Sequence, residues 1–288
     1  MSPSLSLARL HHCRLRSRSI ACIPVFGCVR LLLDRPMLQA LIFDLDGTLA
    51  DTERDGHRVA FNRAFAAAGL NWQWSVAEYG RLLSIAGGKE RLRYFLQHDR
   101  PEFIPPGDRE AFIAALHADK TRHFQELVAT GSIPLRPGVR RLLAEARAAG
   151  IRLAIATTSA LPSAEALVRA TLAPEGTDCF DCIAAGDVVP DKKPAPDIYL
   201  YALDRLGLPA KACVAIEDSP HGLQAAIAAG LKTVVTVNDY TRVENFAAAS
   251  LVLDCLGDPD RPATAIAGEL NGTCFTVKQA RHLLSASV

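Results

Sequence analysis

Two carboxylates separated by one residue are the first candidates for chemistry in this sequence. Asp44 and Asp46 follow an apolar run over 40–43 and precede Gly47 and Thr48. An uninterrupted apolar run is typical of a parallel strand covered on both faces, and open α/β sheets place ligands beyond the carboxyl ends of such strands. A turn at Gly47 lets both carboxylates face one pocket and a hard cation. The alternative is a plain turn, because Asp and Gly are common turn residues.

Further polar residues follow apolar runs later in the chain. Thr157 ends one run, Lys193 precedes Pro194, and the pair Glu217 and Asp218 ends another run. This ordered set resembles the motifs of the haloacid dehalogenase-like hydrolase superfamily, which are Asp-x-Asp-x-Thr, a Thr or Ser, a Lys and an acidic pair. The resemblance implies an α/β fold, a Rossmann-like doubly wound parallel sheet with an inserted α-helical cap.

The composition predicts a globular protein with small-molecule partners. The chain has 288 residues, is 49% hydrophobic and carries a net charge of +1, so it is long enough for one large or two small domains. A protein that mainly binds nucleic acid would have a basic surplus. We therefore expect no nucleic acid or membrane partner, and we expect a monomer.

The eight cysteines are scattered along the chain. Without the character of a small secreted domain, they indicate free thiols in a reducing compartment. Cys179 and Cys182 have the spacing that zinc sites use, but no second pair or nearby His completes four ligands. Free thiols are the favoured interpretation.

The first 36 residues differ from the rest, because five arginines precede the first acidic residue, Asp34. The favoured interpretation is that Met37 is the true start, which makes 1–36 translated upstream sequence and the protein cytoplasmic. The alternative is an organellar transit peptide, which implies a plastid location. The hydrophobic stretch 20–33 is too short, and too broken by Pro24, to span a membrane.

The segment 54–132 has helical patterns and no strand pattern, unlike the sequence on either side of it. We predict that it forms a helical cap inserted into an α/β core made of 37–53 and 133–288. In the first half of the chain, helices are expected over 51–69, 76–83, 89–97 and 108–130.

From Pro137 onward helices and strands alternate, which predicts parallel strands with right-handed crossovers. The tail after Asp254 is weakly patterned, and its pattern does not decide whether 280–285 pack on the core. The expected helices are 138–149, 163–172, 196–206 and 222–229, and the expected strands are 152–156, 183–184, 213–216 and 233–237.

The two aspartates suit the two halves of a phosphoryl transfer. A carboxylate can attack phosphorus and form an aspartyl-phosphate, and we assign this role to Asp44. Asp46 fits the general acid that protonates the leaving oxygen and then the base that activates water. Superfamily dehalogenases lack an acid at that position, so Asp46 favours phosphoryl transfer over dehalogenation.

Magnesium is the expected cofactor, because charge on the phosphoryl oxygens must be balanced in the transition state. Asp44 and Asp218 are the predicted carboxylate ligands, with the main-chain carbonyl of Asp46 as a third and Glu217 in the outer shell. The alternative for this stretch is a helix N-cap at Asp218 or Ser219, and capping does not exclude metal binding.

Thr157 and Lys193 are the predicted phosphate contacts. Thr157 can donate its hydroxyl and backbone N–H, and Lys193 supplies a fixed positive charge. Taken alone, a Thr at a strand end and a Lys before Pro are ordinary residues. Lys192 is adjacent, and the match to Lys-Pro-x-Pro-Asp selects Lys193.

The segments 51–58, 61–62, 87–91 and 193–197 resemble the CbbY group of this superfamily, and the resemblance covers 38–240. Members of the group are bacterial and plastid phosphatases associated with the Calvin cycle that act on xylulose 1,5-bisphosphate. Solvated helix faces are the alternative for any single cap residue. The resemblance implies that the sugar and its second phosphate are held by Glu53, His57, Arg58, Lys89 and Arg91.

The motifs and this resemblance together predict a magnesium-dependent sugar-phosphate phosphatase, and the resemblance implies that it converts xylulose 1,5-bisphosphate to xylulose 5-phosphate. Two alternatives stay open. One is a sugar phosphomutase similar to β-phosphoglucomutase, which shares the fold and the four motifs. The other is a catalytically silent module that binds a sugar phosphate, although such a module has no need for both Asp44 and Asp46.

Overall fold

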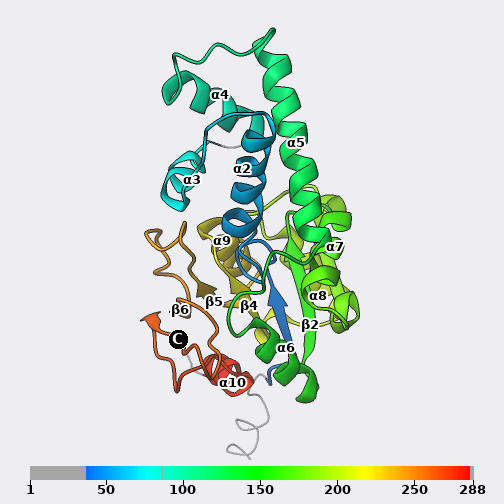
Figure 1. Cartoon of the computed structure of the whole chain (residues 1–288). Coiled ribbons are helices and arrows are strands. Elements are labelled where there is room, and N and C mark those ends of the chain that lie inside the picture. Colours follow the sequence, from blue (N-terminus) through cyan, green and yellow to red (C-terminus); the bar gives the residue numbers. More distant parts are fainter. Residues whose placement is uncertain (1–36, 86, 286–288) are drawn as a thin grey trace, which may run out of the picture. The chain divides into compact units, whose positions relative to one another are not determined.

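A seven-stranded sheet forms the centre of the computed structural model, which describes residues 37–85 and 87–285 (Figure 1). The strand order is β3-β2-β1-β4-β5-β6-β7; β1 to β6 are parallel and β7 is antiparallel to β6. This is the Rossmann order with one added edge strand, so the predicted fold class is confirmed. The strands are β1 Ala40–Phe43, β2 Arg152–Thr157, β3 Cys182–Ala185, β4 Cys213–Glu217, β5 Lys232–Thr236, β6 Leu251–Leu253 and β7 Ala265–Ala267.

The register of the central strands brings their carboxyl ends level with one another. Phe43 of β1 pairs with Ile155 of β2 and with Ile216 of β4. Asp44 follows Phe43 at the end of β1, and Glu217 follows Ile216 at the end of β4. Polar residues from distant parts of the sequence therefore meet at one edge of the sheet.

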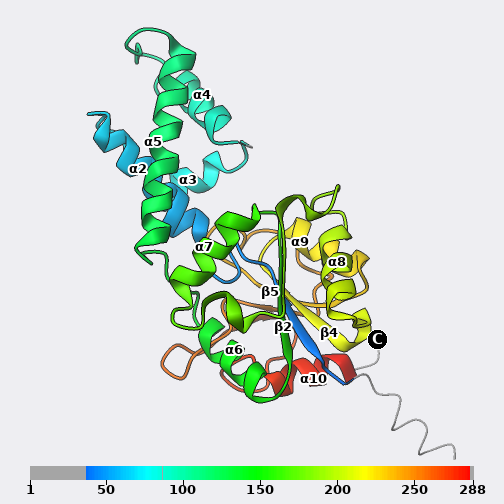
Figure 2. The same ribbon diagram turned by 90° about the vertical axis from the view of Figure 1, so that its right-hand side faces the viewer.

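The two faces of the sheet are covered by different helices (Figure 2). Leu41 and Phe43 belong to one buried cluster, and Ala40 and Ile42 belong to another, because successive strand residues point to opposite faces. The first cluster includes residues of α6 Val139–Ala148, α7 Leu161–Thr171 and α10 Val277–Ser285, and the second includes residues of α8 Asp197–Leu206 and α9 Pro220–Ala228.

The segment 54–132, called the cap below, is helical throughout its described elements. The predicted helix 51–69 divides into a π-helical turn and an α-helix at residue 58. A Cβ on Gly56 would lie 2.8 Å from side-chain atoms of Phe124 and Ile133, so this turn accompanies a close backbone contact. The elements are η1 Thr52–His57, α2 Arg58–Ala67, α3 Val76–Leu82, α4 Gly88–His98 and α5 Arg109–Ala129.

The tail after Asp254 packs on the core, a point that the sequence pattern left open. Phe275 is fully buried, and Val277, Ala280 and Leu284 of α10 lie in the same cluster as β1. The pattern missed β6 and β7 because each strand has three residues.

Several predictions are not decided by the fold. The described residues all belong to one compact unit, so the division into core and cap stays a prediction. The monomeric state and the location also stay predictions. The predicted leader 1–36 lies outside the described residues. None of the described helices is long and apolar enough to cross a membrane.

Replacing Phe275 by Ala should destabilise the whole protein. Removing a fully buried aromatic side chain costs about 3–5 kcal/mol, whereas Ile266→Ala on the exposed face of β7 should change stability by no more than about 0.5 kcal/mol. Urea unfolding of both variants measures the difference. Equal, small effects would show that the tail does not belong to the core.

Candidate active site

Lys193 joins the predicted site residues at the carboxyl edge of the sheet. Its ammonium donates to Asp44 Oδ1 at 2.6 Å, to Glu217 Oε1 at 2.6 Å and to the Ala156 carbonyl at 2.9 Å. These acceptors lie at the ends of β1, β4 and β2. The neighbouring Lys192 donates to the carbonyl of Gly186 instead.

The carboxylates around Lys193 form a buried acidic cluster. One oxygen from each of Asp44, Glu217 and Asp218 lies within 4.8 Å of the others. Burial raises the pKa of Asp44 to about 7, against the attraction of Lys193. Burial also raises the pKa of Asp218, and the charges of Asp44 and Glu217 add to this effect. Burial therefore makes the negative charge of these carboxylates unfavourable without a further positive charge, and oxygen donors suit a hard divalent cation.

Burial by itself lowers the pKa of Lys193, but attraction to Asp44 and Glu217 outweighs burial and raises this pKa above its ordinary value. The ammonium therefore stays charged. Glu217 Oε1 also accepts a bond from the Tyr199 hydroxyl at 2.6 Å. Gly222 leaves room for the carboxylate, because a Cβ there would lie 2.0 Å from Glu217 Cδ.

Ser219 is the N-cap of α9, as the alternative interpretation of this stretch predicted. Its hydroxyl accepts a bond from the backbone N–H of Gly222 at 3.1 Å. The cap satisfies a free N–H of the first turn. Asp218 keeps its carboxylate in the acidic cluster, so the cap does not use this side chain.

Asp46 has different partners from Asp44. Its Oδ1 accepts a bond from the Thr52 hydroxyl at 2.8 Å, and its Oδ2 accepts one from the Ser159 hydroxyl at 2.5 Å. Thr157 Oγ1 accepts the backbone N–H of Ser159 at 3.1 Å, and no acceptor among the described residues takes its hydroxyl proton. The carboxylate of Asp46 is therefore held by neutral hydroxyls rather than by a cation.

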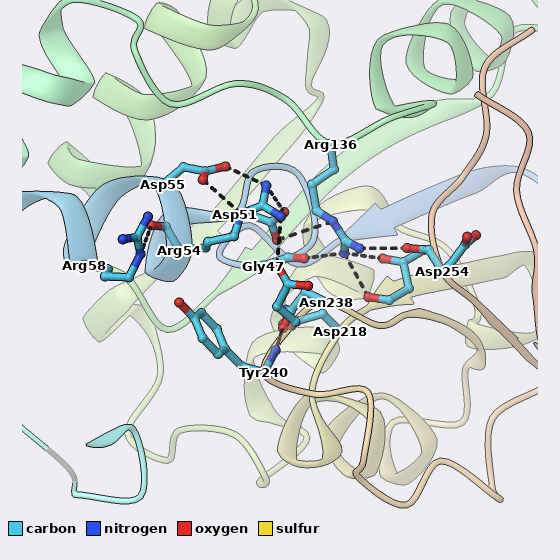
Figure 3. Close-up of polar contacts among 12 residues, drawn as sticks. Gly47, Asp51, Arg54, Asp55, Arg58, Arg136, Asp218, Asn238, Tyr240 and Asp254 are labelled. Atoms are coloured by element: carbon cyan, nitrogen blue, oxygen red, sulfur yellow. Dashed lines mark hydrogen bonds and ion pairs between the residues drawn. The ribbon is translucent and has the colours of Figure 1, made fainter. Parts of the chain in front are cut away.

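The turn after Asp46 lies directly against Asp218. Gly47 has a φ of +89°, and a Cβ there would lie 2.1 Å from Asp218 Oδ2. The buried guanidinium of Arg136 donates to the Gly47 carbonyl at 2.5 Å (Figure 3). Arg136 also binds the carbonyls of Thr236, Val237 and Asp254. One side chain thus ties the turn to the ends of β5 and β6.

Glu53, which directly precedes the cap, and Arg91 of the cap meet through a tyrosine. The Tyr79 hydroxyl donates to Glu53 Oε2 at 2.6 Å and accepts from Arg91 at 2.9 Å. Burial raises the pKa of Tyr79, which keeps the phenol neutral. The buried Arg91 also donates to the carbonyls of Leu82 and Ile85.

The other predicted cap residues have varied surroundings. Burial, with the charge of Lys120, lowers the pKa of His57 to about 3, and the Lys120 ammonium lies 2.9 Å from His57 Nδ1. Burial lowers the pKa of Lys120 to about 8. Arg58 donates to the carbonyls of Arg54 and Trp74. Lys89 is exposed in the first turn of α4.

The structure brings six of the predicted residues together at the sheet edge. Ser159 and Asn238 were missed, although both are polar residues two positions beyond a strand end. Partners that no local pattern could indicate are Thr52, Lys120, Arg136 and Tyr199. The residues brought together are Asp44, Asp46, Thr157, Lys193, Glu217 and Asp218.

Comparison with known proteins agrees with this geometry. Residues 38–230 match the haloacid dehalogenase-like hydrolase family. The protein CbbY of Cereibacter sphaeroides is 50% identical over 222 residues, which are 77% of this chain and 94% of that protein.

Two solved structures are similar to this chain. One is a mutant of CbbY from Rhodobacter sphaeroides in complex with xylulose 1,5-bisphosphate, 50% identical with a TM-score of 0.61, covering 76% of this chain and 95% of that one. The other is a putative β-phosphoglucomutase from Thermotoga maritima, 30% identical with a TM-score of 0.57, covering 70% and 87%. The chain therefore belongs to the haloacid dehalogenase-like hydrolases and, within them, to the CbbY group.

Proposed function

We propose that the protein is a magnesium-dependent phosphatase that hydrolyses xylulose 1,5-bisphosphate to xylulose 5-phosphate and inorganic phosphate. The observation that carries the proposal is the pair of carboxylates with different partners, Asp44 on Lys193 and Asp46 on two hydroxyls. Different surroundings suit different roles in acid–base chemistry. The bisphosphate bound by the Rhodobacter sphaeroides relative supports the substrate.

Asp44 is the proposed nucleophile. Lys193 occupies Oδ1, so we assign the attack to Oδ2. The bond from Oδ2 to phosphorus forms while the bond from phosphorus to the sugar oxygen breaks, which divides the hydrolysis into two displacements. Lys193 remains beside the reacting phosphoryl group and favours its negative charge.

Asp46 is the proposed general acid and base. It gives a proton to the departing sugar oxygen and later takes one from the water that attacks the aspartyl-phosphate. The hydroxyls of Thr52 and Ser159 fix the orientation of its carboxylate. The free hydroxyl proton of Thr157 is directed to a phosphoryl oxygen.

The acidic cluster fits magnesium, because its carboxylate oxygens crowd together and burial opposes their charge. Asp44, Asp218 and the main-chain carbonyl of Asp46 would hold the ion, with Glu217 in the outer shell. A bound ion balances the negative charge of the phosphoryl oxygens.

Glu53 and residues of the cap are proposed to hold the sugar and the second phosphate. Glu53, oriented by Tyr79, accepts a hydrogen bond from a sugar hydroxyl. Arg58 and the exposed Lys89 supply positive charge to the second phosphate. The buried Arg91 belongs to this set because it donates to the Tyr79 hydroxyl. His57 completes this set beside Lys120.

Phosphate release from xylulose 1,5-bisphosphate tests the proposal, with Asp44→Asn as the variant. Loss of the nucleophile should lower kcat at least about a thousandfold, whereas Asp204→Asn on the exposed side of α8 should keep the wild-type rate.

Chelation should stop hydrolysis and added magnesium should restore it.

The same assay separates the alternatives. Conversion of β-glucose 1-phosphate in the presence of a bisphosphate primer would favour the mutase, to which the Thermotoga maritima similarity points. Activity on neither substrate would favour a silent binding module.

An Asp44→Asn protein that keeps a tenth of the rate rejects Asp44 as nucleophile, and undiminished hydrolysis after exhaustive chelation rejects the metal.

Lys89→Ala should weaken the bisphosphate substrate and spare a small aryl phosphate, which does not reach the cap. One lost charge-assisted contact costs about 1.5–3 kcal/mol, or roughly ten- to a hundredfold in kcat/KM. Arg93→Ala on the same helix is the matched control, because Arg93 pairs with Glu110 at the surface. Equal losses on both substrates would mean that Lys89 acts through the fold.

A further inference from the structure

Tyr240 connects the loop after β5 to the cap. Its ring packs against a cluster of buried residues between 61 and 116, called the cap aromatic cluster. The ring meets Tyr79 edge to face, with centroids 5.9 Å apart and planes at 63°. Such aromatic pairs prefer a specific geometry and so favour one arrangement of the two elements. A residue of the 238–242 loop is thus part of the packing of the cap.

Gly80 leaves the space in which this ring packs. It lies inside α3, next to Tyr79, and a Cβ there would be 3.0 Å from Tyr240 Cδ1 and 3.3 Å from Cε1. Glycine is among the least favourable residues in a helix interior, so its presence needs a reason. The space that it leaves is taken by the tyrosine ring.

Asn238 holds the other end of the same loop (Figure 3). Its Oδ1 accepts the backbone N–H groups of Tyr240 at 2.9 Å and Thr241 at 3.2 Å. Its Nδ2 donates to Asp218 Oδ2 at 2.7 Å. The backbone position of Tyr240 is therefore tied to a carboxylate of the acidic cluster.

Tyr79 continues these contacts to Glu53 through its 2.6 Å hydrogen bond. We propose that Tyr240 is a positioning residue that sets specificity: it docks α3 of the cap on the core and, through Tyr79, holds Glu53 toward the sugar. The proposal rests on the proposed function, which assigns the sugar to Glu53.

The ring of Tyr240 carries this role rather than its hydroxyl. The hydroxyl oxygen is buried, and no described residue gives it a hydrogen bond. Burial raises the pKa of Tyr240 to about 12, so the phenol stays neutral. Removing an unpartnered hydroxyl should leave docking intact, while removing the ring should not.

The test measures kcat and KM for xylulose 1,5-bisphosphate and for p-nitrophenyl phosphate, with magnesium present. Tyr240→Ala should lower kcat/KM for the bisphosphate roughly ten- to a hundredfold, since a small misplacement of a remote contact has effects of this size. The loss should fall mainly on kcat, because remote binding energy is used to reach the transition state. The aryl phosphate should change less than about threefold, which also shows that the core is folded.

Three variants make the comparison specific. Tyr240→Phe should keep wild-type kinetics. Gly80→Ala should lower bisphosphate turnover although Ala favours the helix, so its loss cannot come from a weaker α3. Tyr94→Ala removes an aromatic side chain that packs on the same cluster but stacks on His98, and it should spare both substrates.

A double-mutant cycle tests the route through Tyr79. If Tyr240 acts on Glu53 through Tyr79, the losses from Tyr240→Ala and Tyr79→Phe should be clearly less than additive. Additive losses, equal losses on both substrates, or full activity of Tyr240→Ala on the bisphosphate would each overturn the proposal.

A measurement without substrate separates this proposal from the proposed function. Amide hydrogen exchange in residues 76–82 should be faster in Tyr240→Ala than in wild type, because docking protects α3. A wild type without phosphatase activity would reject the proposed function alone, and exchange would still test docking. Unchanged protection in the variant would reject docking alone.

Discussion

Lys193 carries one positive charge into contact with Asp44 and Glu217, at an edge of the sheet where Asp218 adds a further buried carboxylate. Breaking a buried ion pair by removing one partner costs about 3–5 kcal/mol, so the elements that carry these residues have little freedom to move apart. The strand order satisfies this constraint, because β1 lies between β2 and β4. The Ala156 carbonyl at the end of β2 takes the remaining bond of the ammonium.

The sequence was sufficient to predict the central strands and the acidic edge. Apolar runs of strand length end at Phe43 and Ile216, and the carboxylates that follow them meet because parallel strands share an edge. Thr157 was found by the same reasoning. Resemblance to a family selected Lys193 over Lys192, since the two residues have the same side chain and neighbouring positions.

Other contacts depend on tertiary packing and leave no local pattern. Arg136 and Gly47 are 89 positions apart, and a single Arg before Pro and Gly gives no indication of a buried guanidinium. Lys120 lies on the long helix α5 among exposed charged residues, and its burial beside His57 becomes visible only when α5 packs on η1. The helix α10 was missed in a weakly patterned tail, and the helix on which it packs, α6, lies far away in the sequence.

The turn at Gly47 lies where two identical side chains in one motif have different surroundings. A positive φ that glycine adopts without strain lets the chain leave β1 abruptly, so Asp44 stays among buried carboxylates and Asp46 lies beside the hydroxyls of Thr52 and Ser159. Burial raises the pKa of Asp44 to about 7 despite Lys193, which makes a neutralising charge at the acidic cluster favourable. Arg136 fixes the carbonyl of that same glycine, and a Cβ at Gly47 would meet Asp218. The different surroundings of the two aspartates therefore go with the shape of one turn. Arg136 ties that turn to the ends of β5 and β6, and Asp218 packs against it.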